Sequence, residues 1–275
     1  MEIDIISAQF DSQQTNRYSL WMRFGSRECA FTILDNSTKQ FVRIRKIGQI
    51  PFSKTIDLFK ELSFIPFSNV TIALESQFPV VVPSSLYQPA KKYEFIAFNT
   101  DISMGHEVME HVLPSLSLVQ LFTLTPSLKT VVASYFPQAR LVHATSSVLV
   151  AMQLLSRINK QQTIMGVLLT ENNVHLCLFE SGKLLFFNSF LTKTKEDIAY
   201  WVLRLFDQFD LNTTQVQLYL QGIDNSLDDR ILILKQYISK VQLLPFPSSC
   251  KLASDLRSEQ LQSFTDLFYM PLCEL

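Results

Sequence analysis

Glycine is scarce in this sequence, with 6 residues among 275. Glycine lets backbone N–H groups approach phosphate oxygens closely, so few phosphate-binding loops can be present. Positive charge is not in excess either, because 24 Lys and Arg stand against 25 Asp and Glu, a formal net charge of -1. Nucleic acids and anionic membrane surfaces select basic faces. The composition therefore argues against a protein that works on either.

Long apolar runs are also missing, since a membrane-spanning helix takes about 18 or more apolar residues. The nearest candidates, residues 164–169 and 174–179, are short and separated by a polar turn. The N-terminus carries Glu2 and Asp4 and has neither the basic start nor the apolar stretch of an export signal. We expect no membrane insertion and a cytoplasmic location.

Metal-binding patterns are weak. The four cysteines are far apart and form no Cys-x-x-Cys pair, which favours reduced core thiols over a zinc site or redox couple. His106 and His111 are five positions apart, about 140° around a helix, whereas a helical zinc site needs a spacing of four. His143 and His175 belong to apolar runs and are expected to be neutral packed histidines. We expect no metal.

The first half begins with three extended runs over residues 18–24, 28–34 and 40–46, which predict a three-stranded meander. A helix starting near Ser53 and a strand over 70–74 follow. Beyond them we expect strands over 79–82, 94–98, 118–123 and 139–143, and helices over 105–113 and 125–136.

The second half repeats this order after a helix over 145–158. A second meander is predicted over 164–169, 174–179 and 183–190. Thr194 and Asp197 form a capping-box pattern before a helix with apolar residues at helical spacing. A strand over 216–220, a helix capped by Ser226 and a closing strand over 241–244 complete the expected elements.

Each half therefore contains an antiparallel meander followed by parallel strands linked by helices, which is the ribonuclease H-like topology. A duplicated copy of it is the actin-like architecture. Through residues 166–190, the helix start at 196–197 and the strand at 218–222, the chain resembles this superfamily. It is similar to the small pilus-assembly and secretion-type bacterial members, and most of all to an uncharacterised bacterial family with an actin-like ATPase fold.

The resemblance implies an α/β fold of two tandem ribonuclease H-like domains, with mixed sheets and helices on their faces. The first domain is expected over residues 1–144 and the second over 145–275. In active members, a meander turn of each half supplies a phosphate loop that reads roughly Asp-x-Gly-Thr/Ser or Asp-x-Gly-Gly. Its aspartate holds metal-bound water, and its glycines admit the phosphate oxygens.

This sequence departs from that pattern. Its first loop places Gly25 and Ser26 as the family does, but Arg23 stands where the aspartate is expected. The second loop, residues 169–173, has no glycine, and Gly222 is one of the two glycines expected near the adenosine. Glu75 follows the strand over 70–74, so its carboxylate is expected to face the cleft between the domains.

The resemblance with these losses favours a non-enzymatic actin-like protein with a degraded nucleotide site. It would need no cofactor and serve as a protein-interaction or scaffold module whose partner is another protein. The edge strands over 40–46 and 183–190 are candidates for pairing with a strand of that partner. Homo-oligomerisation stays open.

The alternative is an ATP-binding protein or weak ATPase, with ATP and Mg as cofactors. It would use Gly25, Ser26 and Gly222, with Glu75 as ligand of metal-bound water. A third interpretation, a nucleic-acid module, rests on Arg43 and Arg45, which alternate onto one strand face. Charges on an edge strand commonly prevent aggregation instead, so no nucleic-acid partner is expected.

Overall fold

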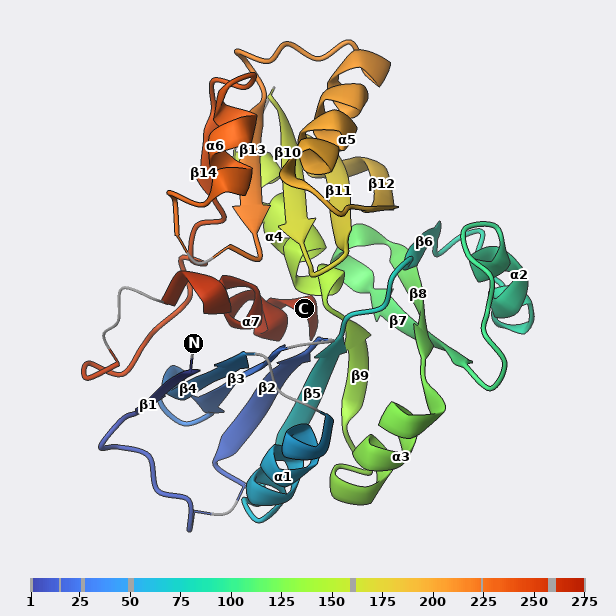
Figure 1. Cartoon of the computed structure of the whole chain (residues 1–275). Helices are drawn as coiled ribbons and strands as arrows, with labels where there is room; N and C mark the ends of the chain where they lie inside the picture. The colour runs from blue at the N-terminus through green and yellow to red at the C-terminus, as the bar shows by residue number, and fades with distance from the viewer. Residues whose placement is uncertain are drawn as a thin grey trace.

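The computed structural model describes residues 2–14, 16–25, 28–48, 52–158, 162–223, 225–256 and 261–274. Two large mixed sheets lie one above the other, and a smaller three-stranded sheet lies beside their junction (Figure 1). None of the helices in these residues has the length and apolar character of a membrane span.

The first large sheet has six strands in the order β1-β4-β3-β2-β5-β9. Their bounds are β1 (Glu2–Ile6), β2 (Tyr18–Phe24), β3 (Glu28–Asp35), β4 (Gln40–Gly48), β5 (Asn69–Leu74) and β9 (Arg140–His143). The strands from β1 to β2 pair antiparallel, while β5 is parallel to β2 and β9 is parallel to β5. The β4 strand is covered by β1, so the prediction that residues 40–46 form an edge is wrong.

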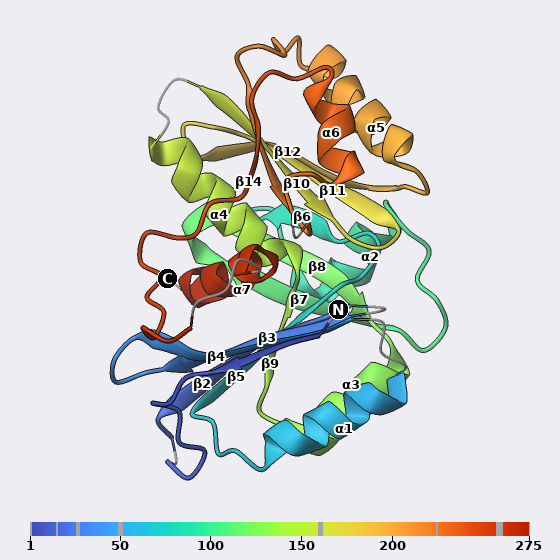
Figure 2. The same ribbon diagram turned by 60° about the vertical axis from the view of Figure 1, so that its left-hand side comes forward.

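Two helices cover one face of this sheet, α1 (Phe52–Ser63) and α3 (Pro126–Tyr135) (Figure 2). Phe59 of α1 is fully buried in the core formed with the strands, where its ring contacts Phe136. Thr125 caps α3, as predicted, by accepting a hydrogen bond from the backbone N–H of Leu128.

The second large sheet has five strands in the order β12-β11-β10-β13-β14. They are β10 (Thr163–Leu169), β11 (Asn173–Glu180), β12 (Lys183–Leu191), β13 (Gln217–Gln221) and β14 (Val241–Leu243). One face packs on α4 (Thr145–Ile158), and the other on α5 (Lys195–Gln208) and α6 (Asp229–Lys235). Side chains alternate along β10, so Met165 and Val167 face α5 and α6 whereas Ile164 and Leu168 face α4.

The two sheets share one topology. In each, the first three strands form an antiparallel meander, and the fourth and fifth lie parallel beside the first strand of that meander. This repeat confirms the predicted α/β class with duplicated ribonuclease H-like units, to which β1 adds one edge strand. The domain boundary at residue 144 stays a prediction.

The small sheet, β6-β8-β7, arises from a segment inserted between β5 and α3. It consists of β6 (Val80–Pro83), β7 (Glu107–Leu113) and β8 (Leu118–Leu124), with α2 (Lys92–Ala97) beside it. The helix predicted over 105–113 and the strand predicted over 94–98 are therefore wrong. Pairing with β8 decides the conformation of β7, and long-range pairing overrides local preference in strands.

The C-terminal segment returns to the first sheet. The Phe41 N–H donates to the Lys251 carbonyl, and the Ala253 N–H donates to the Phe41 carbonyl, at 2.8 and 3.0 Å. Helix α7 (Thr265–Tyr269) then lies on the sheet face opposite α1 and α3 (Figure 2). Short 3-10 turns occur at Pro89–Lys91, Pro114–Leu116, Leu261–Phe264 and Met270–Glu274. The return brings residues from the end of the chain to the cleft between the sheets.

Candidate functional site

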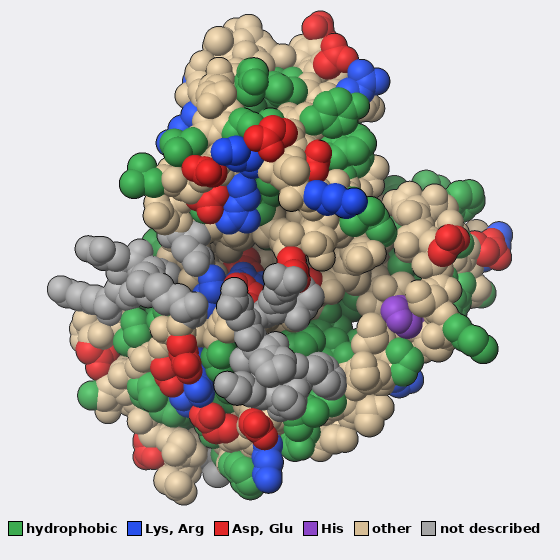
Figure 3. All heavy atoms as spheres, in the orientation of Figure 1, with side chains coloured by type: hydrophobic (Ala, Val, Ile, Leu, Met, Phe, Trp, Pro, Cys, Tyr) green, Lys and Arg blue, Asp and Glu red, His purple; other side chains and the backbone are tan. Residues whose placement is uncertain are grey.

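A cleft of about 490 Å³ lies between the two large sheets, at the carboxyl ends of β2, β5, β10 and β13. Ligands of open α/β sheets commonly bind at such strand ends. Figure 3 shows the hollow between the upper and lower parts of the molecule, with both cationic and acidic side chains around it. Its charged lining residues are Arg23, Lys46, Arg230, Glu28, Glu75, Glu171 and Asp228.

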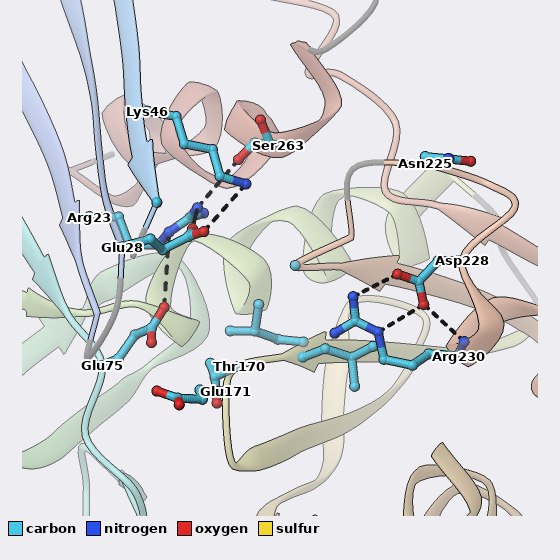
Figure 4. A pocket seen from close by; sticks show the side chains of 14 residues that line it. Arg23, Glu28, Lys46, Glu75, Thr170, Glu171, Asn225, Asp228, Arg230 and Ser263 are labelled. Atoms are coloured by element: carbon cyan, nitrogen blue, oxygen red, sulfur yellow. Dashed lines mark hydrogen bonds and ion pairs between the residues drawn. The ribbon is translucent and has the colours of Figure 1, made fainter. Parts of the chain in front are cut away.

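The Arg23 side chain, near the end of β2, is 5% exposed and surrounded by carboxylates (Figure 4). Its Nη1 donates to Asp266 Oδ2 at 2.6 Å, its Nη2 donates to Glu28 Oε1, and its Nε lies 4.0 Å from Glu75 Oε1. Burial alone would lower the pKa of Arg23, but these carboxylates outweigh it and raise the pKa. The guanidinium is therefore permanently charged and neutralised within the protein.

Asp266 connects this cluster to the second sheet. It lies in α7 and is 2% exposed, and its Oδ1 accepts a hydrogen bond from Gln221 Nε2 at 2.9 Å. Gln221 is the last residue of β13, while Arg23 belongs to β2. The chain Arg23, Asp266, Gln221 thus joins the two halves of the molecule across the back of the cleft.

The other cations of the cleft also have carboxylate partners. Lys46 Nζ lies 3.3 Å from Glu28 Oε2, and Arg230 Nη2 donates to Asp228 Oδ2 at 2.8 Å (Figure 4). Burial would raise the pKa of Glu28, but Arg23 and Lys46 lower it below its ordinary value. Among the residues that line the cleft, the four carboxylates therefore outnumber the three cations.

Glu75 follows β5 directly, as expected, and its backbone N–H donates to the Phe24 carbonyl at 3.1 Å. Burial raises the pKa of its carboxyl to about 7, and the acidic groups of Glu28, Asp266 and Glu171 add to this against the opposing effect of Arg23. Much of Glu75 is therefore protonated at neutral pH.

The Glu75 carboxyl lies against Gly25, in the space that a side chain at position 25 would fill. A Cβ atom on Gly25 would lie 2.5 Å from Glu75 Oε2, so a larger residue would displace the carboxyl. Gly222 has φ +87°, and a Cβ atom there would lie 2.0 Å from the Leu169 carbonyl oxygen. Gly222 is therefore required by the backbone packing, whereas Gly25 leaves room for the Glu75 carboxyl.

The structure brings together most of the residues predicted for the site. Glu75 and Gly222 line the cleft, Gly25 lies against Glu75, and Ser26 falls outside the described residues. Asp266 was not among the predicted site residues, because only the return of the C-terminal segment places it beside Arg23. Glu28 was not predicted either, although the β2-β3 hairpin register pairs Phe24 with Cys29 and so places Glu28 close to Arg23.

The other candidates from the sequence lie in structural networks. Arg43 forms ion pairs with Asp4 and Glu61, and Arg45 with Glu2, so their charges are engaged by carboxylates. The described residues contain no group of three His, Cys, Asp or Glu side chains suited to a metal ion.

The histidines of the interior are neutral. His143 and His175 are buried with ring centroids 5.8 Å apart, and burial is the main cause that lowers both pKa values, that of His143 to about 4. His111 lies in β7, where its Nδ1 is 3.0 Å from Ser146 Oγ and burial lowers its pKa to about 4. His106 precedes β7 and His111 lies within it, so the two histidines do not lie on a helix.

A family model described as protein of unknown function (DUF3822) matches residues 7–241. The chain belongs to the DUF3822 family. No curated protein gives a significant match to its sequence.

Solved structures similar to this DUF3822 chain share its fold. One is a Bacteroides thetaiotaomicron protein with an actin-like ATPase fold and unknown function, with TM-score 0.78 and 21% identity over 86% of this chain and 94% of that chain. Another belongs to the PilM-PilN type IV pilus biogenesis complex, with TM-score 0.66 and 12% identity over 93% of this chain and 96% of that chain. The predicted actin-like ATPase fold is thereby confirmed.

Proposed function

We propose that this DUF3822 protein is a non-catalytic actin-like protein that works by binding another protein. The observation that carries the proposal is that Arg23, which stands where active members have the aspartate of the first phosphate loop, is buried and paired with carboxylates. Its guanidinium cannot hold Mg²⁺, and its Nη1 and Nη2 already donate to Asp266 and Glu28.

The charges of the cleft support the loss of nucleotide binding. A triphosphate would have to compete with Asp266 for Arg23, with Glu28 for Lys46 and with Asp228 for Arg230. Of these three pairs only Arg23–Asp266 is fully buried, and removing one partner from a buried ion pair costs about 3–5 kcal/mol. The remaining lining carboxylates would repel the phosphates as well. Gly222, close to Leu169, serves packing whether or not a nucleotide is present.

Strand β12 supports protein binding. It lies at the edge of the second sheet, as predicted for residues 183–190, and one row of its backbone groups is open to a further strand. One solved structure with this fold comes from the PilM-PilN type IV pilus biogenesis complex, so a protein with this fold occurs in an assembly with another protein. A scaffold or interaction role fits both observations.

Thermal denaturation in the presence of Mg-ATP tests the loss of nucleotide binding. A ligand at about 100 times its dissociation constant stabilises a folded protein by about 2.7 kcal/mol, which is a visible rise in melting temperature. We expect the same melting temperature with and without Mg-ATP. A rise that saturates with Mg-ATP concentration would overturn the proposal.

An ATP-binding protein or weak ATPase remains the second candidate, because Gly25, Glu75 and Gly222 do gather at one cleft. With Ser26, these residues would hold the nucleotide, and Glu75 would orient metal-bound water. This function requires Mg²⁺-dependent phosphate release that Glu75→Gln abolishes. Glu196→Gln, which changes an exposed carboxylate of α5, is the matched control and should leave it unchanged.

A further inference from the structure

We infer that the groove between β6 and β12 binds an extended, apolar peptide segment of the partner protein that carries a carboxylate at one end. This inference rests on the proposed protein-binding function and specifies which chemical groups the partner presents. The groove measures about 500 Å³ and lies apart from the cleft described above. Its walls come from β6, β12, α4 and the turn Pro114–Leu116.

Two sheet edges face this groove. β12 is an edge strand of the second sheet, and β6 is an edge strand of the small sheet. Val81 of β6 and residues 184–187 of β12 all line the groove. Figures 1 and 2 both place β6 next to the β12 side of the second sheet. Each edge leaves backbone N–H and C=O groups that an added strand can pair with, and the irregularity at Leu185 divides those of β12 into two short stretches.

The side chains of the groove are mainly apolar. Leu116, Leu118, Leu184 and Phe187 line it, and Leu185 remains 46% exposed. A long apolar edge that is left uncovered promotes unspecific strand pairing, so proteins usually protect such edges. Leu118 is already buried, so an apolar segment in the groove would mainly cover Leu185 and the remaining exposed surface of the others, at about 25 cal/mol for each Å² of apolar surface.

Gln153 provides a polar group that lacks a partner. Its side chain lines the groove from α4, the residue is 2% exposed, and its Nε2 donates to the Ser115 carbonyl. Its Oε1 is buried and accepts no hydrogen bond from the described residues. An unsatisfied buried acceptor costs about 1–3 kcal/mol. Because this oxygen has almost no accessible surface, a backbone N–H of an inserted segment would satisfy it only after the Gln153 side chain turned toward the groove.

The charges at one end of the groove define the occupant further. Arg157 and Lys183 are the charged residues that line the groove, and neither forms an ion pair with a described residue. The ideal Cβ position of Gly182 lies 2.6 Å from Arg157 Cγ, so Arg157 lies over the turn that precedes Lys183. Both side chains are exposed and have no ion-pair partner in the part of the chain that the structure describes, so they favour a carboxylate at this end of the groove. Residues 183–191 contain no Asp or Glu, so a second copy paired through β12 would not supply one.

Fluorescence anisotropy with short labelled peptides tests the inference. The probe is a fluorescein-labelled, C-terminally amidated peptide of four alternating Val and Leu residues followed by Asp. Matched probes replace Asp by Lys, or by Gly with a free C-terminal carboxylate. We expect saturable binding of the Asp probe, at least tenfold weaker binding of the Lys probe, and binding of the Gly acid if a chain end can supply the carboxylate.

Variants locate the binding. Lys183→Glu and Arg157→Glu should each weaken binding of the Asp probe about tenfold and strengthen binding of the Lys probe. The control Lys235→Glu changes an exposed cation of α6, on the other face of the sheet, and should leave both affinities unchanged. Unaltered melting temperatures would show that the variants are folded.

Three results would overturn the inference: no binding of either charged probe, equal binding of both, or a concentration-dependent dimer in sedimentation that Lys183→Glu abolishes. The last would assign the edge to a second copy. Failure of the peptide experiment with an unchanged melting temperature in Mg-ATP overturns this inference alone. A saturable rise in Mg-ATP overturns the proposed loss of nucleotide binding.

Discussion

At the scale of single residues, Asp266 is the main partner of the buried Arg23. Asp266→Asn leaves Glu28 as the remaining close carboxylate, so the loss should be smaller than the 3–5 kcal/mol typical of a broken buried pair. We expect a fall of about 2–3 kcal/mol in the free energy of unfolding, measured by urea denaturation. Arg23→Met combined with Asp266→Leu should cost less than Asp266→Asn. A double variant that is less stable than Asp266→Asn would contradict the role given to this pair.

Glu75 should make stability depend on pH. Burial raises its pKa from 4.5 to about 7 in the folded protein, so between these values the folded state binds more protons than the unfolded state. The free energy of unfolding contributed by Glu75 therefore falls as pH rises through this range. One pKa unit corresponds to about 1.4 kcal/mol. Because the Glu75 side chain is partly exposed, we expect the change in the free energy of unfolding over this pH range to be about 2 kcal/mol.

The Glu75→Gln variant isolates this contribution. Glutamine does not titrate, so the variant should gain about 2 kcal/mol relative to the wild type between pH 4.5 and pH 8. The buried His143 changes stability in the opposite direction as pH rises, but it is present in both proteins and cancels in the difference. Urea denaturation at a series of pH values measures the difference. A difference that is constant with pH would show that Glu75 is not protonated in the folded protein.

At the scale of elements, the capping box of α5 is both predicted and observed. Thr194 accepts a hydrogen bond from the Asp197 N–H at 3.2 Å, and Asp197 accepts one from the Thr194 N–H at 3.0 Å. Thr194→Ala should lower the free energy of unfolding by about 1 kcal/mol. The control Thr213→Ala changes a half-buried threonine in a turn that caps no helix, and it should have a smaller effect. Equal effects of the two substitutions in thermal denaturation would contradict the capping role.

Elements with a strong periodic pattern could be predicted from the sequence. The helix α5 and both meanders follow this rule, because their apolar residues recur at the spacing of a helix or occur in strand-length runs bounded by turns. The small sheet and its helix were not predicted correctly, because β7 is a strand where a helix was predicted and α2 is a helix where a strand was predicted. Their conformation depends on β8 and on neighbouring loops, and no local pattern carries that information. The covering of β4 by β1 depends in the same way on distant pairing.

At the scale of the whole molecule, the duplicated topology places the candidate site. Glu75 and Gly222 could be predicted because each follows a parallel strand whose carboxyl end faces the cleft. Asp266 and Ser263 could not, because they reach the cleft only when the chain returns to the first sheet after β14. The network from Arg23 through Asp266 to Gln221 depends on this return. The C-terminal segment thereby links the two halves at the position where a nucleotide would bind.

Equilibrium dialysis of the whole protein against radiolabelled ATP and Mg²⁺ tests the central claim most directly. The cleft that contains the ion-paired Arg23 should retain no nucleotide, so we predict equal ATP concentrations on both sides of the membrane at every protein concentration. Saturable retention of ATP by the wild type, lost in Glu75→Gln and kept in Glu196→Gln, would contradict the claim.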